Sequence, residues 1–310
     1  MSADACDPQR RRLLRGLLLG AALGTPSLKA LARPSADFNR KPGPGVVERG
    51  SAFYRFDTRS LESRDGERRY RITVGTPRRK APATGYPPLY LLDGNAALAE
   101  LDQALLAALA KGEAPLLVAI GYETRRRFDL AARERDYTPT RPGQGLIDNR
   151  RHSGRKGGGA DAFLRLLEHE IVVPIEREIN VDESARGLWG HSFGGLFTLY
   201  ALTQRPALFT RWYAASPSLY WNEGQVLEHL DRWRWPRTTK GQAFLLRGNR
   251  ELGNRRRGGL DDAALNERLS VLAARLDGMA HFDARTLIVS DTDHGAMLRH
   301  SLRFTLSRYF

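Results

Sequence analysis

Cysteine is nearly absent from this 310-residue sequence, which contains only Cys6. A single cysteine cannot form an intramolecular disulfide, so the stability of the fold must come from a large packed core. Hydrophobic residues make up 41% of the chain and charged residues 27%, which is a globular composition rather than a disordered or membrane one.

Motifs for nucleic-acid binding are also missing, although the chain is basic. The sequence contains 49 Lys and Arg against 35 Asp and Glu, and the arginines are scattered rather than gathered in one block. It has no helix-turn-helix, zinc-finger or RNA-binding motif, so we do not expect nucleic acid as a partner. The excess charge favours instead a basic surface or cleft that attracts an anionic small molecule.

No apolar run is long and continuous enough to cross a membrane comfortably, so we do not expect stable membrane insertion. Near the N-terminus, Arg11 and Arg12 precede a short run rich in Leu, Ala and Gly, and Ala30 and Ala32 follow with the spacing of a signal-peptidase site. This pattern predicts a signal peptide of the twin-arginine type over residues 1–32. Cleavage after Ala32 would remove Cys6, which excludes a cysteine nucleophile.

The rest of the chain alternates strand-like and helix-like segments. Residues 33–50 are rich in Pro and Gly and predict a flexible mature N-terminus. We predict strands over 53–58, 69–75, 88–92, 116–121, 187–189, 212–215, 243–247 and 286–289. We predict helices over 97–111, 160–179, 194–204, 261–276 and 296–309. The alternation indicates an α/β fold with a mostly parallel sheet, and the first two strands, with no helix between them, predict an antiparallel hairpin at its edge. The basic, glycine-rich segment 149–159 is interpreted as a mobile loop, either a solvated linker, which is preferred, or a charged lip over the site.

The most specific motif surrounds Ser192, in the run Gly-His-Ser-Phe-Gly over residues 190–194. A G-x-S-x-G sequence between an apolar strand and a helix is the nucleophile elbow of α/β-hydrolases. The tight turn predicts that small residues are required at Gly190 and Gly194. We therefore predict an α/β-hydrolase domain over residues 51–310, with about eight strands, helices on both faces, and Ser192 as nucleophile.

A base and an acid should follow the serine along the chain, in that fold's order of serine, acid and histidine. His294 follows the last predicted strand, which would place it at the carboxyl edge of the sheet beside Ser192. Glu251 is the first carboxylate after the strand 243–247 and is the preferred acid. Alternatives are Asp261, Asp262, Asp291 and Asp293, or a Ser–His dyad without an acid. The oxyanion hole is predicted from the backbone N–H groups of Phe193 and Asn95.

In these and further segments the chain resembles the periplasmic siderophore esterases that cut enterobactin-type trilactones, a branch of the esterase family of α/β-hydrolases. The segments that carry the resemblance are 89–95, 120–124, 127–130, 136–139, 157–163, 190–195, 215–218 and 293–295. The resemblance implies a catecholate siderophore substrate, free or ferric, and a periplasmic location. It also implies that Arg133 contacts the siderophore, while Glu251 fits the wider family better than the siderophore branch, for which a dyad has been proposed.

A ferric tris-catecholate is an anion with planar rings, which arginines can neutralise and stack on. We therefore expect Arg133 and Arg127 to bind substrate, with Trp189, Tyr220 and Trp221 as candidate aromatic faces, although core packing is favoured most for Trp189. No cofactor or metal is expected, because any iron would arrive with the substrate. Two alternatives remain: a general secreted carboxylesterase for simple or aromatic esters, and a catalytically silent siderophore-binding protein on a hydrolase scaffold.

Overall fold

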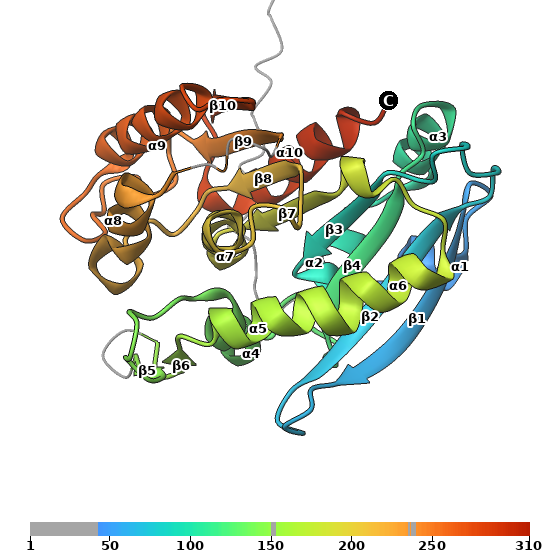
Figure 1. Ribbon diagram of the computed structural model, residues 1–310, viewed down its shortest axis with the longest axis horizontal. Coiled ribbons are helices and arrows are strands. Elements are labelled where there is room, and N and C mark those ends of the chain that lie inside the picture. The colour runs from blue at the N-terminus through green and yellow to red at the C-terminus, as the bar shows by residue number, and fades with distance from the viewer. Residues whose placement is uncertain (1–42, 150–152, 235, 237–239) are drawn as a thin grey trace, which may run out of the picture. The chain divides into compact units, whose positions relative to one another are not determined.

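An eight-stranded sheet forms the centre of the molecule, with helices on both of its faces (Figure 1). The computed structural model describes residues 43–149, 153–234, 236 and 240–310, all within one compact unit, Ser35–Phe310. The strand order is β1-β2-β4-β3-β7-β8-β9-β10. The strands are β1 (Tyr54–Glu62), β2 (Arg69–Pro77), β3 (Pro88–Leu92), β4 (Leu116–Tyr122), β7 (Gly187–His191), β8 (Arg211–Ala215), β9 (Gly241–Gly248) and β10 (Phe282–Val289).

The sheet is antiparallel at one edge and parallel elsewhere. β2 pairs antiparallel with both β1 and β4, whereas the successive pairs from β4 to β10 are parallel. Every residue of β3, β4 and β7 is buried. Central strands covered on both faces read as continuous apolar runs, which explains why the sequence reveals them. The predicted fold class and the edge hairpin are confirmed.

Two apolar clusters lie on opposite faces of the sheet. One is covered by α1 (Val46–Arg49), α2 (Gly94–Leu98), α3 (Gln103–Lys111) and α10 (His294–Ser307). The other is covered by α4 (Leu130–Tyr137), α5 (Ala160–Leu166), α6 (Val173–Glu178), α7 (Phe193–Gln204), α8 (Gln225–Arg232) and α9 (Asp262–Asp277). Because α7 enters the second cluster directly after β7, the serine between them lies at the carboxyl edge of the sheet.

Two of the predicted helical segments need adjustment, and two further helices were not predicted. The segment 97–111 is two helices, because Asp102 is extended and caps α3 by accepting a hydrogen bond from the Leu105 N–H. The segment 160–179 is one helical run interrupted by a π-helical stretch, Leu167–Val172. The sequence did not predict α4, whose buried positions include three charged residues, or α8. α4 buries charged residues where an apolar stripe would be expected, whereas α8 is a short helix that buries only Val226 and Leu230.

Two segments predicted to be loose have definite structure where they are described. Within 33–50, the helix α1 buries Val46 against the core, while residues 33–42 lie outside the described part of the chain. Within 149–159, β6 (Lys156–Gly157) pairs with β5 (Ile147–Asp148). The side chains of Asn149, Ser153 and Arg155 converge on the buried carboxylate of Glu134, which fixes this segment against α4. Residues 1–32 also lie outside the described residues.

Candidate active site

Ser192 lies on a strained turn between β7 and α7. Its backbone has φ 62° and ψ −115°, a conformation that non-glycine residues rarely adopt. A Cβ at Gly190 would lie 2.3 Å from the Gly194 carbonyl oxygen, and one at Gly195 would lie 2.4 Å from that of Ala215. A Cβ at Gly194 would meet neighbours only at ordinary contact distances. The close approaches therefore require glycine at 190 and 195, and the expected requirement at 194 is not found.

The structure brings Ser192, His294 and Glu251 into one hydrogen-bonded chain. His294 Nε2 lies 3.0 Å from Ser192 Oγ, and His294 Nδ1 lies 2.8 Å from Glu251 Oε2. The three residues come from the ends of three strands, since His294 begins α10 just after β10 and Glu251 follows β9. This geometry can pass a proton from the hydroxyl to the imidazole and stabilise the cation that results.

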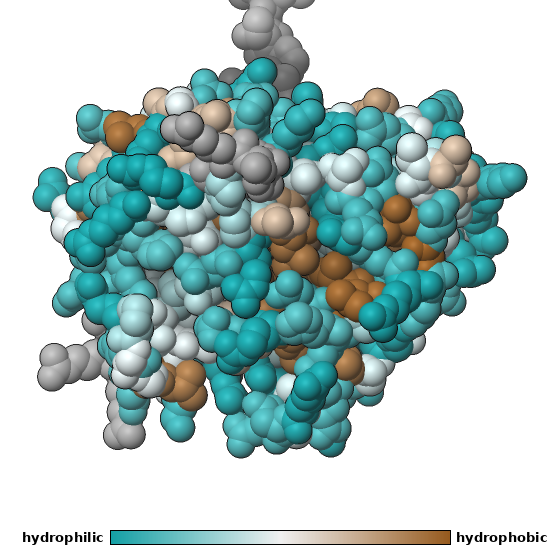
Figure 2. All heavy atoms as spheres, viewed as in Figure 1, coloured by the Kyte–Doolittle hydropathy of each residue, from teal (hydrophilic) through white to brown (hydrophobic). Residues whose placement is uncertain are grey.

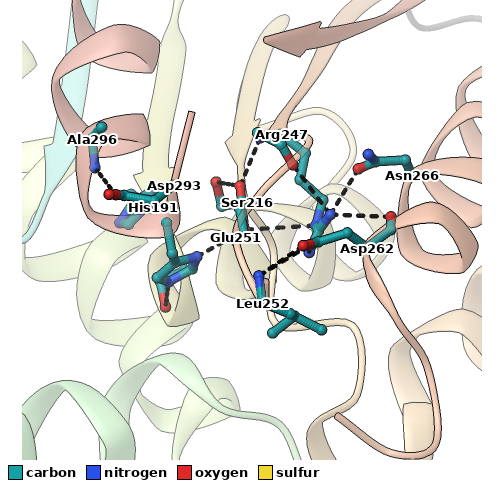
Figure 3. Close-up of polar contacts among 12 residues, drawn as sticks. His191, Ser216, Arg247, Glu251, Leu252, Asp262, Asn266, Asp293 and Ala296 are labelled. Carbon is teal, nitrogen blue, oxygen red and sulfur yellow. Dashed lines mark hydrogen bonds and ion pairs between the residues drawn. The ribbon is translucent and has the colours of Figure 1, made fainter. Parts of the chain in front are cut away.

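Glu251 is buried, with 7% of its surface exposed, and its carboxylate is well supplied with donors. Oε1 accepts hydrogen bonds from Ser216 Oγ at 2.6 Å and from the Gly248 N–H at 2.7 Å, and Arg247 Nε lies 3.6 Å from Oε2 (Figure 3). Burial by itself raises the pKa of Glu251, but the hydrogen bond and charge of His294, together with Arg247 and Ser216, outweigh it and lower that pKa below its ordinary value. The acid therefore stays ionised beside the imidazole.

The alternative acids are engaged elsewhere. Asp291 is exposed and pairs with Arg250, while Asp293 caps α10 by accepting from the Ala296 N–H. Asp261 caps α9, and Asp262 binds Arg247 and the Leu252 N–H. Of the candidate acids named above, Glu251 is the residue whose carboxylate meets His294 Nδ1.

The two predicted oxyanion donors lie at the N-termini of neighbouring helices. Phe193 is the first residue of α7 and Asn95 is the second residue of α2. N–H groups in the first turn of a helix have no partner within the helix, so they are free to bind a developing negative charge. The Asn95 side chain anchors that turn to β4, because its amide donates to the carbonyls of Tyr122 and Thr124 and its Oδ1 accepts from the Tyr122 N–H.

The two arginines predicted to bind substrate are instead paired inside the protein. Arg133 Nε and Nη2 each lie 2.9 Å from an oxygen of Asp93, and the Arg133 side chain is only 6% exposed. Arg127 Nη2 lies 2.5 Å from Glu100 Oε1, with both side chains mostly buried. Neither guanidinium is an open cation, because each pairs with a carboxylate from a distant part of the sequence. That the two arginines bind substrate stays a prediction.

Trp221 forms part of the wall beside the nucleophile rather than an open aromatic face. It is 7% exposed, its Nε1 donates to the Pro139 carbonyl, and its ring packs edge-on against Phe193 at 5.4 Å between centroids. Tyr220 is more open and carries the Arg257 guanidinium 5.7 Å above its ring. Arg257 and the exposed Arg125 and Arg126 are cations that sequence reasoning did not single out as ligands.

His191 lies next to Ser192 but takes no part in the hydrogen-bonded chain. Its ring is buried and lies 4.7 Å from the His294 ring, between centroids. Burial, followed by the charges of His294 and Arg133, holds the pKa of His191 well below its usual range. The sequence-based interpretation of His191 as a packing residue agrees with this position, where a neutral ring contacts the base.

Sequence reasoning missed Ser216, Arg247 and Asp93. Arg247 joins Asp262, Asn266 and Glu251, and so links the loop after β9 to α9 (Figure 3). The available signal was a charged residue at the end of an otherwise apolar strand, followed four residues later by a carboxylate. Ser216 and Asp93 both have positive φ, as Ser192 does, which places three strained residues at the ends of β3, β7 and β8.

A cavity of about 510 Å³ lies beside α2, lined in part by Arg71, Asn95, Leu98, Thr124 and Arg125. Ser192 and His294 do not line it, so the hydrogen-bonded chain rather than this cavity locates the chemistry. The face in Figure 2 is mostly hydrophilic, with apolar residues gathered in a central band. Among the described residues, no helix is long and apolar enough to cross a membrane, and no cluster of His, Cys, Asp and Glu could hold a metal ion.

A serine on a strained strand-to-helix turn, contacting a histidine and a buried carboxylate at the carboxyl edge of a parallel sheet, defines the α/β-hydrolase class. Within that class, the chain belongs to the family described as "Putative esterase", whose model matches residues 63–278. The predicted family is thereby confirmed.

The relatives and solved structures agree with this assignment. The chain is 42% identical over 193 residues to the apo-salmochelin esterase of Escherichia coli O6:H1, an alignment covering 62% of this chain and 59% of that relative. It is 31% identical to the ferri-bacillibactin esterase BesA of Bacillus subtilis, covering 76% and 86%. The structure titled "Enterobactin and Salmochelin Hydrolase IroE" is similar with a TM-score of 0.72 and 33% identity, covering 86% of this chain and 99% of that one.

Proposed function

We propose that this protein hydrolyses the ester bonds of a catecholate siderophore of the enterobactin type, free or ferric. The observation that carries the proposal is the hydrogen-bonded triad. His294 Nε2 lies 3.0 Å from Ser192 Oγ, and His294 Nδ1 lies 2.8 Å from Glu251 Oε2. The names of the relatives supply the substrate class, since the two described above act on salmochelin and bacillibactin.

The reaction proceeds through an acyl-enzyme. His294 accepts the Ser192 proton as the oxygen attacks the lactone carbonyl, and the N–H groups of Phe193 and Asn95 hold the oxyanion. His294 then gives its proton to the departing alkoxide, and a water activated by the same imidazole releases the acid. Glu251 keeps the His294 proton on Nδ1 and stabilises the imidazolium. Opening the trilactone separates the three catecholates and loosens any iron that they hold.

An anionic substrate suits the charge of this chain, which is +14 overall. With Arg133 and Arg127 paired internally, the cations available to it are exposed ones. Arg257 is held against Tyr220, which lies two residues after Ser218, and the Ser218 N–H donates to the Ser192 carbonyl oxygen. A catecholate arm could meet both the guanidinium and the aromatic ring there.

The proposal extends to location. The double arginine, the apolar run and the small residues at 30 and 32 support export to the periplasm by the twin-arginine route. Measuring the mass of the protein recovered from the periplasm checks this, since a chain that retains residues 1–32 would contradict it.

Replacement of the nucleophile tests the reaction. Incubating wild type and Ser192→Ala with apo and ferric enterobactin, followed by mass spectrometry, should show linear products for the wild type alone, because the variant has no attacking oxygen. Binding of the siderophore, followed by fluorescence quenching, should persist in the variant.

Three outcomes would contradict the proposal. An unchanged cleavage rate in Ser192→Ala would reject the mechanism. A wild-type kcat/KM that is higher for p-nitrophenyl butyrate than for the trilactone would favour a general carboxylesterase. Siderophore binding without cleavage by the wild type would favour a silent binding protein.

A further inference from the structure

A buried ion pair joins the two backbone segments that carry the oxyanion donors. Asp93 ends β3 in a left-handed conformation, φ 51°, and is the N-cap of α2, two residues before Asn95. Both oxygens of its carboxylate accept from Arg133 of α4, at 2.9 Å each. Arg133 Nη2 also donates to the carbonyl oxygen of His191 at 3.3 Å, two residues before Phe193. One guanidinium therefore contacts the end of β3 and the end of β7.

The position of this guanidinium is strongly constrained. Its centre lies 5.3 Å from the ring centroid of Phe128, 5.8 Å from that of Tyr137 and 5.3 Å from that of Phe193. Phe193 is itself the residue whose N–H serves as the first oxyanion donor. Asp93 is 2% exposed and Arg133 5% exposed, so solvent has little access to the pair. The bidentate geometry adds directional specificity that a lysine could not reproduce.

Sheet pairing does not by itself fix the distance between the two donors. The register of β3 with β7 ends at Leu91 and Trp189, before either donor segment begins. Stabilisation of an oxyanion depends on donors held within about 0.5 Å of their productive positions. A buried ion pair is weak evidence for stability, because the desolvation of two charges offsets their attraction. The free-energy cost of burying this ion pair is better explained by the geometry that the pair imposes on the two donor segments.

We propose that Arg133 is a positioning residue that, through Asp93 and the His191 carbonyl, sets the spacing of the Asn95 and Phe193 N–H groups. The proposal rests on the esterase reaction proposed above. It differs from a role in siderophore recognition, because positioning of the oxyanion hole affects every ester that the enzyme cleaves, whatever the charge of the substrate.

The test compares a neutral ester with the anionic trilactone in Arg133→Gln, Arg133→Lys and Asp93→Asn. For p-nitrophenyl butyrate we expect kcat to fall about 10- to 100-fold with KM within about twofold, somewhat less than the loss of a whole oxyanion donor. The affinity for an uncharged trifluoromethyl ketone, which mimics the tetrahedral intermediate, should fall in parallel. Lysine should fail to restore kcat, because it cannot bind Asp93 through two parallel hydrogen bonds.

The matched control is Arg135→Gln, on the same helix, because Arg135 pairs with the exposed Glu67. It should leave kcat and inhibitor affinity unchanged. Circular dichroism at the assay temperature identifies folded variants, and Asp93→Asn, which keeps one acceptor oxygen, supplies the measurement if Arg133→Gln does not fold. A loss confined to KM for the trilactone would overturn the proposal and make Arg133 a substrate ligand. Normal kcat on the neutral ester in folded variants would also overturn the positioning role of Arg133. Failure of the esterase proposal would look different, because cleavage of the neutral ester would then survive in Ser192→Ala.

Discussion

Glu251 shows how one side chain can be both structural and chemical. Its carboxylate receives hydrogen bonds from Ser216 and from the Gly248 N–H while it contacts His294 Nδ1. The lowered pKa keeps it charged, so the group opposite the imidazole remains an anion as the pH falls toward the acid range. The charge matters most when His294 becomes a cation in the transition state.

Glu251→Gln should therefore lower kcat with little change in KM. By analogy with other triads in which the acid is converted to an amide, we expect a loss of about 10³- to 10⁴-fold, because the amide no longer fixes the tautomer or balances the imidazolium charge. Steady-state hydrolysis of p-nitrophenyl butyrate measures it. Asp291→Asn and Asp293→Asn are the controls and should stay within about threefold of wild type, since Asp291 is exposed and asparagine can replace Asp293 as a helix cap. Near-normal kcat in Glu251→Gln would indicate a Ser–His dyad.

The sequence predicted the local part of the site better than its long-range part. Ser192 stands in a motif whose geometry is set by its immediate neighbours, and His294 follows from strand order. The pairing of Arg133 with Asp93, 40 positions away, has no local signal. An arginine in a single sequence looks equally available whether it faces solvent or a buried carboxylate, which is why the internal pairing of Arg133 and Arg127 could not be predicted.

Helix α4 reverses the usual pattern of an amphipathic element, because it buries Arg133, Glu134 and Asp136. Asp136 is fully buried and accepts hydrogen bonds from the hydroxyls of Tyr70 and Tyr122, with Arg68 3.7 Å away. Burial raises the pKa of Asp136 to about 6, although the two tyrosines and Arg68 act in the opposite direction. Charge at these positions is the reason that hydrophobic periodicity failed to predict the helix.

This raised pKa makes stability depend on pH in a defined direction. An unfolded aspartate titrates near about 3.9, so between about pH 4 and 6 the folded chain binds a proton that the unfolded chain releases. The contribution of Asp136 to the free energy of unfolding therefore rises as the pH falls from 6 to 4. A shift of about two units corresponds to about 3 kcal/mol. In Asp136→Asn, which cannot ionise, this contribution should be absent.

Urea unfolding of wild type and Asp136→Asn at several pH values from 4.5 to 7 measures the effect, and the difference between the two proteins isolates the residue. Wild type should lose stability relative to the variant as the pH rises. Asp161→Asn is the control, because Asp161 is exposed and pairs with Arg165 on the surface. A wild-type–variant difference that does not change with pH would contradict the assignment.

At the scale of the whole molecule, the strands were predicted more accurately than the helices. All eight predicted strands occur in the central sheet, since each buried strand is a short apolar run with polar boundaries. The break between α2 and α3 escaped prediction because Ala97 to Lys111 remains a good helical sequence throughout, and Asp102 acts as a cap rather than as a helical residue. Caps depend on backbone geometry that composition alone does not determine.

The net charge of +14 acts on association rather than on the fold, and it leads to a prediction about salt. An anionic siderophore should be drawn toward a basic enzyme, with Arg125, Arg126 and Arg257 exposed among its cations. Raising the ionic strength from about 0.01 to 1 M shortens the screening length from about 30 to 3 Å. We therefore expect kcat/KM for ferric enterobactin to fall about tenfold or more over this range, within the span reported for electrostatic steering.

Stopped-flow or steady-state assays in sodium chloride measure this fall in kcat/KM, with p-nitrophenyl butyrate as the neutral control. If both substrates lose activity equally, salt acts on the enzyme itself; if neither does, the excess arginine has no role in capturing the substrate.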